Sequence, residues 1–180
     1  MENNYRKIQD LRTTELFVKR SGFWCPDHIL IDGQFEYGRL MRPKLFRCER
    51  IIETADGDFK LQRKGFWGRE IEIFKNEEKV GSLARNTWDN KQTLQLHTGF
   101  NATFARTAGS GIFSRKKSWS SNEHGELLTI KSVFSFSKPF IINIINTNTN
   151  KNQVPFLLMA LLGVNTILRQ QEQAAAATSA

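Results

Sequence analysis

Residues 154–168, VPFLLMALLGVNTIL, are the segment that most limits what this chain can fold into. They are apolar almost all the way round a helical wheel, and a helix without a polar face has to be buried on every side. Such a helix is about 22 Å long, shorter than the roughly 30 Å hydrocarbon core of a bilayer. This length disfavours the alternative of a tail inserted in a membrane. We therefore expect protein to surround the helix, and we expect no transmembrane segment.

The residues that precede this helix have the pattern of short antiparallel strands. In the segment 69–74, REIEIF, charged residues alternate with Ile71 and Ile73, as in a half-buried strand. Asp-Gly pairs at 32–33 and 56–57 are typical of hairpin turns. Similar segments recur from a first short strand at 15–19 to a last one at 139–145. Many antiparallel strands can enclose a helix only by curling round it. The sequence therefore predicts a mostly β fold, a single closed antiparallel β-barrel of about 11–12 strands enclosing a C-terminal apolar α-helix.

The predicted organisation is one domain with short extensions. Residues 1–14 form a polar N-terminal extension, residues 15–171 the barrel domain, and residues 172–180 a disordered tail. The polar stretch 146–152 links the last strand to a central helix at about 153–170. The helix residues expected in the core are Phe156, Leu157, Leu158, Leu161, Leu162 and Ile167.

Positive charge is concentrated in the middle of the chain. The net charge is +8, and residues 42–119 hold sixteen Lys and Arg against nine Asp and Glu. Such a field favours an anionic partner, either a lipid surface or nucleic acid. The alternative is that scattered Lys and Arg only keep sheet edges soluble.

The sequence motifs resemble those of one known superfamily. IIETADGDFKLQRKGF and REIEIFKNEEKVGSLAR are similar to two successive hairpins of LURP-one-related proteins and phospholipid scramblases, and LLMALLGVNTIL resembles their final apolar helix. The order of these elements over residues 28–170 resembles the tubby C-terminal-like superfamily. That resemblance implies a barrel around a central helix and a link to phospholipids. The acidic calcium segment and the cysteine-rich tract of scramblases have no counterpart here, so those activities are not implied.

Two clusters combine cations with aromatic residues, RKGFWGR at 63–69 and SRKKSW at 114–119. Such clusters suit a membrane interface, where rings lie at headgroup depth and cations meet lipid phosphate. The candidate headgroup-binding residues are Arg63, Lys64, Trp67, Arg69, Arg115, Lys116 and Lys117. In the alternative interpretation Trp67 and Trp119 face the core and only their charged neighbours face solvent.

Nothing in the sequence indicates catalysis. His28, His97 and His124 are far apart and have no partner at metal-ligand spacing, and there is no GxSxG motif. We therefore expect no enzymatic activity, no cofactor and no metal. Cys25 and Cys48 form no CxxC motif, and the first twenty residues contain no apolar signal segment, so we expect a cytoplasmic protein.

The predicted function is a non-enzymatic cytoplasmic binding module that associates peripherally with anionic phospholipid headgroups. One alternative is a single-stranded nucleic-acid-binding β-barrel, since basic strands with exposed aromatic residues can stack bases. Another is a scramblase-like or structural protein of unassigned activity. The sequence does not predict an oligomeric state.

Overall fold

The chain folds into a closed antiparallel β-barrel with one C-terminal α-helix. The computed structural model describes residues 5–23, 25–43, 49–65, 69–86, 91–107, 115–146 and 154–178. A 3-10 helix, η1, spans Ile8–Asp10, and the α-helix, α1, spans Phe156–Thr178. The strands are β1 (Glu15–Ser21), β2 (Asp27–Ile31), β3 (Glu36–Met41), β4 (Arg50–Thr54), β5 (Gly57–Lys64), β6 (Glu70–Lys75), β7 (Glu78–Arg85), β8 (Gln92–Leu96), β9 (Asn101–Arg106), β10 (Lys116–Ser121), β11 (Gly125–Ser132) and β12 (Phe140–Ile144).

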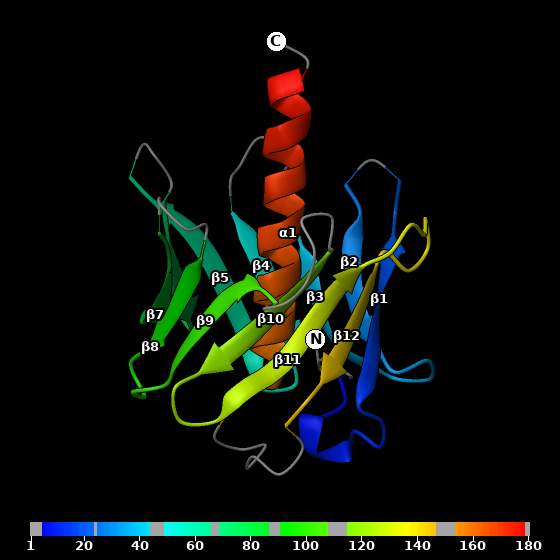
Figure 1. Cartoon of the computed structure of the whole chain (residues 1–180), viewed down its shortest axis with the longest axis horizontal. Helices are drawn as coiled ribbons and strands as arrows, with labels where there is room; N and C mark the ends of the chain where they lie inside the picture. The colour runs from blue at the N-terminus through cyan, green and yellow to red at the C-terminus, as the bar shows by residue number, and fades with distance from the viewer. Residues whose placement is uncertain are drawn as a thin grey trace.

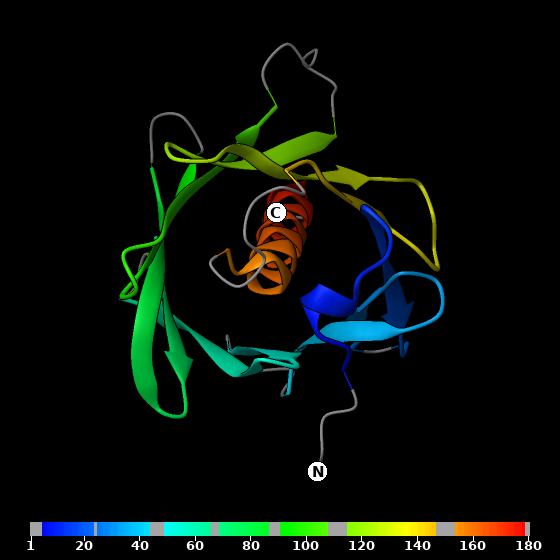
Figure 2. The same ribbon diagram turned by 90° about the horizontal axis from the view of Figure 1, so that it is seen from below.

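The twelve strands follow one another around the barrel in chain order. Each pairs antiparallel with its neighbour in sequence, and β1 pairs with β12 to close the sheet, with Glu15 opposite Asn143 and Val18 opposite Phe140. Closure leaves the sheet without an unpaired edge. Seen along the barrel axis, the strands form a ring around α1 (Figure 2). The predicted fold class is confirmed, with twelve strands.

Local sequence explains the hairpins. Gly33 and Gly57 have φ angles of 107° and 120°, which the Asp-Gly turns require and which residues with a Cβ rarely adopt. Strand β6 has the predicted alternation, since Ile71 and Ile73 are buried while their neighbours are partly exposed. The inward-facing apolar side chains of the strands form one buried cluster that lines the barrel wall.

Helix α1 fills the space inside this wall. All six helix residues predicted in the core are buried, and Leu161 and Leu162 are completely so. The helix packs against β3, β4 and β11, and its C-terminal turns extend beyond the end of the barrel (Figure 1). In the part of the chain that is described, no helix is long and apolar enough to cross a membrane.

The helix ends later than the sequence predicted. It was expected to end near residue 170, with a disordered tail at 172–180, whereas α1 continues to Thr178. The extra turns are exposed to solvent and include Ala174–Ala177. Alanine has the highest intrinsic helix propensity, and Glu172 in these turns pairs with Arg50, so the helix continues past residue 170.

The N-terminal extension also contributes to the core. Ile8 and Leu11 are 4% and 7% exposed and belong to the main apolar cluster. The backbone N–H of Arg6 donates to the carbonyl of Glu36, which places the extension beside the start of β3. A segment that is polar on average therefore still covers one end of the barrel.

At Gly163 helix α1 lies very close to the barrel wall. A Cβ atom at this position would lie 2.4 Å from Ile130 Cδ1 and 2.9 Å from Trp119 Nε1. A Gly163→Ala variant is therefore expected to lose about 1–3 kcal/mol of unfolding free energy, although alanine favours helices. Urea denaturation measures this change, and Gln173→Ala on the exposed part of α1 is the control. A stabilised Gly163→Ala variant would show that the helix is not held this closely.

Candidate anion-binding site at the helix-exit end

Charge is sorted between the two ends of the barrel. The connections β1–β2, β3–β4, β5–β6, β7–β8, β9–β10 and β11–β12 lie at the end where α1 emerges, here called the helix-exit end. Their described residues include one acidic residue, Glu49, and five cations, Arg42, Arg69, Lys91, Arg115 and Lys138. The five hairpin turns at the opposite end contain no Lys or Arg and four carboxylates, Asp32, Asp56, Glu77 and Glu123.

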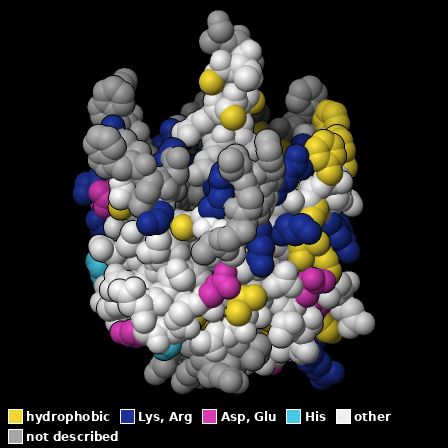
Figure 3. All heavy atoms as spheres, in the orientation of Figure 1, with side chains coloured by type: hydrophobic (Ala, Val, Ile, Leu, Met, Phe, Trp, Pro, Cys, Tyr) yellow, Lys and Arg dark blue, Asp and Glu magenta, His cyan; other side chains and the backbone are white. Residues whose placement is uncertain are grey.

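The strand ends strengthen this asymmetry. Eight further cations lie within two residues of a strand terminus at the helix-exit end: Arg20, Arg50, Arg63, Lys64, Arg85, Arg106, Lys116 and Lys117. Lys and Arg side chains accordingly gather around the base of the projecting helix, while Asp and Glu side chains lie mostly below them (Figure 3). An electrostatic field of one sign at one end attracts anions and orients the molecule toward them.

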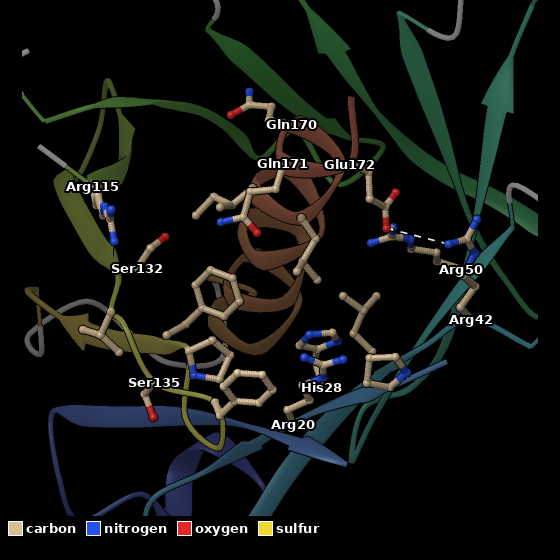
Figure 4. A pocket seen from close by; sticks show the side chains of 18 of the residues that line it. Arg20, His28, Arg42, Arg50, Arg115, Ser132, Ser135, Gln170, Gln171 and Glu172 are labelled. Atoms are coloured by element: carbon tan, nitrogen blue, oxygen red, sulfur yellow. Dashed lines mark hydrogen bonds and ion pairs between the residues drawn. The ribbon is translucent and has the colours of Figure 1, made fainter. Parts of the chain in front are cut away.

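A cavity of about 900 Å³ opens at this end, between the last turns of α1 and the barrel wall (Figure 4). Residues from β1, β2, β3, β4, β10 and the β11–β12 connection line it. Its cationic lining residues are Arg20, Arg42, Arg50, Arg115 and Lys117. Its volume lies in the range of small-molecule sites.

Glu172 is the one acidic residue among the described residues that line the cavity. Its Oε1 lies 2.7 Å from Arg50 Nη2 and 3.7 Å from Arg42 Nη1. The Arg50 side chain is 8% exposed and that of Glu172 is 50% exposed. Burial lowers the pKa of Arg50, and the nearby Glu172 carboxylate partly offsets that effect. The half-exposed carboxylate of Glu172 thus forms ion pairs with two guanidinium groups.

Lys117 points inward from β10. Its ammonium group donates a hydrogen bond to Gln170 Oε1 and lies 5.7 Å from the centre of the Phe104 ring. Burial, with Arg106 and Arg85 nearby, lowers the pKa of Lys117 to about 8. The group is therefore mostly charged at pH 7 and loses its charge just above pH 8.

His28, on β2, is buried in the same lining. Burial, with Arg50 and Arg20 nearby, lowers the pKa of His28 from 6.5 to about 4. Its imidazole is therefore neutral at pH 7 and adds no cation to the cavity.

The His28 pKa predicts a pH-dependent stability. The unfolded chain binds a proton on His28 near pH 6.5, but the folded chain does so only near pH 4, so protonation favours unfolding. This group is expected to remove about 3 kcal/mol of unfolding free energy as the pH falls from 7 to 4. Urea denaturation of wild type and His28→Gln at several pH values measures it. If the unfolding free energies of the two proteins changed with pH in parallel, His28 would not be the source of the pH dependence.

Two phenylalanines stand exposed beside the cavity. Phe134 and Phe136, in the β11–β12 connection, are 97% and 90% exposed. The guanidinium of Arg115 lies 5.3 Å from the centre of the Phe134 ring, and that of Arg20 lies 5.9 Å from Phe136. Large apolar side chains next to cations are the arrangement that peripheral membrane surfaces use.

The predicted binding residues fall into distinct groups. Arg115 and Lys117 line the cavity, whereas Lys116 is half-buried and does not. Arg63, Lys64 and Arg69 are exposed at the same end but outside the cavity. Lys64 Nζ lies 3.3 Å from Glu70 Oε2 and 3.8 Å from Glu72 Oε1, so its charge is largely balanced.

Each of the two clusters also contains a tryptophan, Trp67 or Trp119. Trp67 lies outside the described residues. Trp119 is completely buried, and its ring centre lies 4.9 Å from that of Phe104. The alternative interpretation of Trp119, a core side chain with charged neighbours, is therefore correct.

Sequence reasoning missed Arg20, Arg42, Arg50 and the exposed pair Phe134 and Phe136. These residues are far apart in the chain, and none belongs to either basic-aromatic cluster. The sequence nevertheless contained a signal for the cationic end, because successive connections between strands alternate between cationic and acidic character. In an up-and-down barrel alternate connections lie at the same end.

Within the described ranges, no group of three or more His, Cys, Asp or Glu side chains could hold a metal ion. Cys25 is a half-buried free thiol in the cavity lining, and Cys48 lies outside the described residues.

The fold and the site define a class: a closed 12-strand antiparallel barrel with a C-terminal helix and a cationic cavity beside that helix. No protein-family model, no curated protein and no solved structure matches the chain. Any function therefore has to be inferred from the site itself.

Proposed function

We propose that this chain is a non-enzymatic module that binds anionic phospholipid headgroups peripherally, at a cytoplasmic membrane surface, through the helix-exit end. The observation that supports this most directly is the joint presence, at one end, of most cations of the barrel and of the exposed Phe134 and Phe136. At the opposite end four of the five hairpin turns carry a carboxylate and none carries a Lys or Arg.

The magnitudes suit reversible binding. Each Lys or Arg near an anionic membrane contributes on the order of 1 kcal/mol, and this contribution falls within a Debye length. Five cations held close to such a surface would give about 5 kcal/mol, and two inserted phenylalanines would add to this. Salt is expected to weaken such binding strongly.

The architecture also supports placing the chain in the tubby C-terminal-like superfamily as part of the same proposal. A closed antiparallel barrel around a C-terminal apolar helix is the arrangement that the sequence motifs resembled. Fold alone does not define a ligand, so the headgroup proposal depends on the charges and phenylalanines of the helix-exit end.

Liposome flotation tests the proposed function. We expect the protein to float with vesicles containing phosphatidylserine at low salt, less so near physiological salt, and not with phosphatidylcholine vesicles. Absence of flotation with anionic vesicles at low salt would overturn the proposal. Tight binding of a short single-stranded oligonucleotide, with a steep salt dependence, would favour nucleic acid instead.

The phenylalanines separate insertion from simple charge attraction. A Phe134→Ser/Phe136→Ser double variant keeps every cation, and both side chains are exposed, so the fold should be unaffected. We expect the double variant to bind anionic vesicles about tenfold more weakly than wild type, and this ratio should not depend on the salt concentration. The matched control is Phe35→Ser, an exposed phenylalanine of the β2–β3 turn at the opposite end. Equal losses in both proteins would contradict insertion through this end.

A further inference from the structure

The cavity at the helix-exit end contains apolar side chains in its lining, and simple contact with a membrane surface does not require them. Part of its lining, here called the apolar wall, consists of Leu40, Phe140 and Ile167, all less than 9% exposed, and of the half-buried Val133 and Leu168. A headgroup that touches only the rim would leave this apolar wall unused. The wall lies directly beside the cationic side chains, within the same cavity.

The charges of the cavity are also unbalanced. Among its described lining residues, five cations face one carboxylate, that of Glu172. Arg50, the most buried of these cations, has that shared carboxylate as its ion-pair partner. Arg50 and Arg42 lie 2.7 Å and 3.7 Å from that carboxylate, and the other three lining cations add positive charge that it does not balance, so the cavity attracts an additional anion.

We propose that the cavity binds one molecule of an anionic amphiphile, with a phosphate or similar head and a single hydrocarbon chain. This inference rests on the proposed function and deepens it, because it assigns one ligand molecule to a defined site. The head lies near Arg50 and Arg42, where it competes with the Glu172 carboxylate. The chain lies against Ile167, Leu168 and Phe140. The exposed Phe134 and Phe136 flank the opening through which such a molecule would leave a membrane.

Three probes test the ligand class by isothermal titration calorimetry: dodecyl phosphate below its critical micelle concentration, inorganic phosphate, and dodecyl maltoside. We expect dodecyl phosphate to bind with one-to-one stoichiometry and at least about tenfold more tightly than either other probe. Equal binding of inorganic phosphate would show that the apolar wall is unused. Equal binding of the maltoside would show that the cations are unused. Either result, or no saturable binding of dodecyl phosphate, overturns the inference.

Two variants of α1 distinguish the cavity from the general field of the helix-exit end. Gln171 is exposed and its side chain points into the cavity (Figure 4). Gln173 is equally exposed but lies about 200° further round the helix and does not line the cavity. Gln171→Glu and Gln173→Glu therefore add the same charge to the same helix, one inside the cavity and one outside.

We expect Gln171→Glu to weaken dodecyl phosphate binding by about tenfold, because its carboxylate competes for the guanidinium groups. Gln173→Glu should change it less than about twofold. Equal effects would mean that the amphiphile meets only a diffuse field, and would overturn the cavity assignment. Glu172→Gln should instead strengthen binding several-fold, and unchanged or weaker binding would contradict a head at Arg50 and Arg42.

Flotation of the same proteins keeps the two proposals separable. If wild type floats with anionic vesicles but does not bind dodecyl phosphate, the proposed function stands and the cavity site is rejected. If dodecyl phosphate binds but no protein floats, the membrane-surface role is rejected, and the cavity is a site for soluble amphiphiles.

Discussion

A Leu161→Glu variant is expected not to reach the native fold. Leu161 is completely buried, at the middle of the part of α1 that the barrel encloses, and its side chain packs against β3 near Gly38. Removing a buried leucine side chain typically costs about 2–5 kcal/mol, and an unpaired buried carboxylate adds several more. Domains of this size are stable by only about 5–15 kcal/mol, so the loss approaches the whole stability.

Near-ultraviolet circular dichroism and urea denaturation test this prediction. We expect the Leu161→Glu variant to lack fixed aromatic signals and a cooperative transition. Gln173→Glu introduces the same residue on the exposed end of the same helix and should unfold like wild type. A cooperative transition of Leu161→Glu close to that of wild type would show that α1 is not the core of the barrel.

The second large effect is expected from Arg115→Gln/Lys116→Gln/Lys117→Gln. Each lost cation should remove on the order of 1 kcal/mol of attraction to an anionic membrane, so binding should fall by about 100-fold. The domain should stay folded, because none of the three side chains is fully buried. Neutralising Lys117 even relieves the burial of a charge, as the lowered pKa of its ammonium group indicates.

Flotation with phosphatidylserine vesicles at low salt measures this effect, and thermal unfolding verifies the fold. The control is Lys7→Gln/Arg12→Gln/Lys60→Gln, which removes the same charge from the opposite end and from the outer face of β5. Similar losses in both triple variants would mean that net charge, and not the helix-exit end, controls binding. Unchanged binding of the 115–117 variant would refute the proposed surface.

Much of the fold was predictable because its signals are local. The Asp-Gly turns, the period-two alternation of β6 and the apolar segment from Val154 each depend on a few neighbouring residues. A helix apolar on all sides leaves few arrangements for the strands before it, so the barrel followed from two local patterns together. The end of α1 was less predictable, since its last turns also depend on the pairing of Glu172 with Arg50, 122 residues away in the sequence.

The candidate site was only half predictable. The motif at 114–119 led to Arg115 and Lys117, but the same pattern suggested an interfacial role that Trp119 does not have. Arg20 and Arg50 belong to no motif. They line one cavity with Glu172 because only β2 and β3 separate β1 from β4 in the closed barrel and α1 emerges beside them.

The strands, their turns, the buried helix and the concentration of positive charge along the chain could all be read from the residues, because backbone preference and side-chain periodicity act between neighbours. Which cations face a common space, and which aromatic residues are buried or exposed, followed from the three-dimensional fold. Those properties depend on the closure of β1 on β12 and on the direction in which α1 leaves the barrel. Both arise from the packing of the whole chain, and no local segment specifies them.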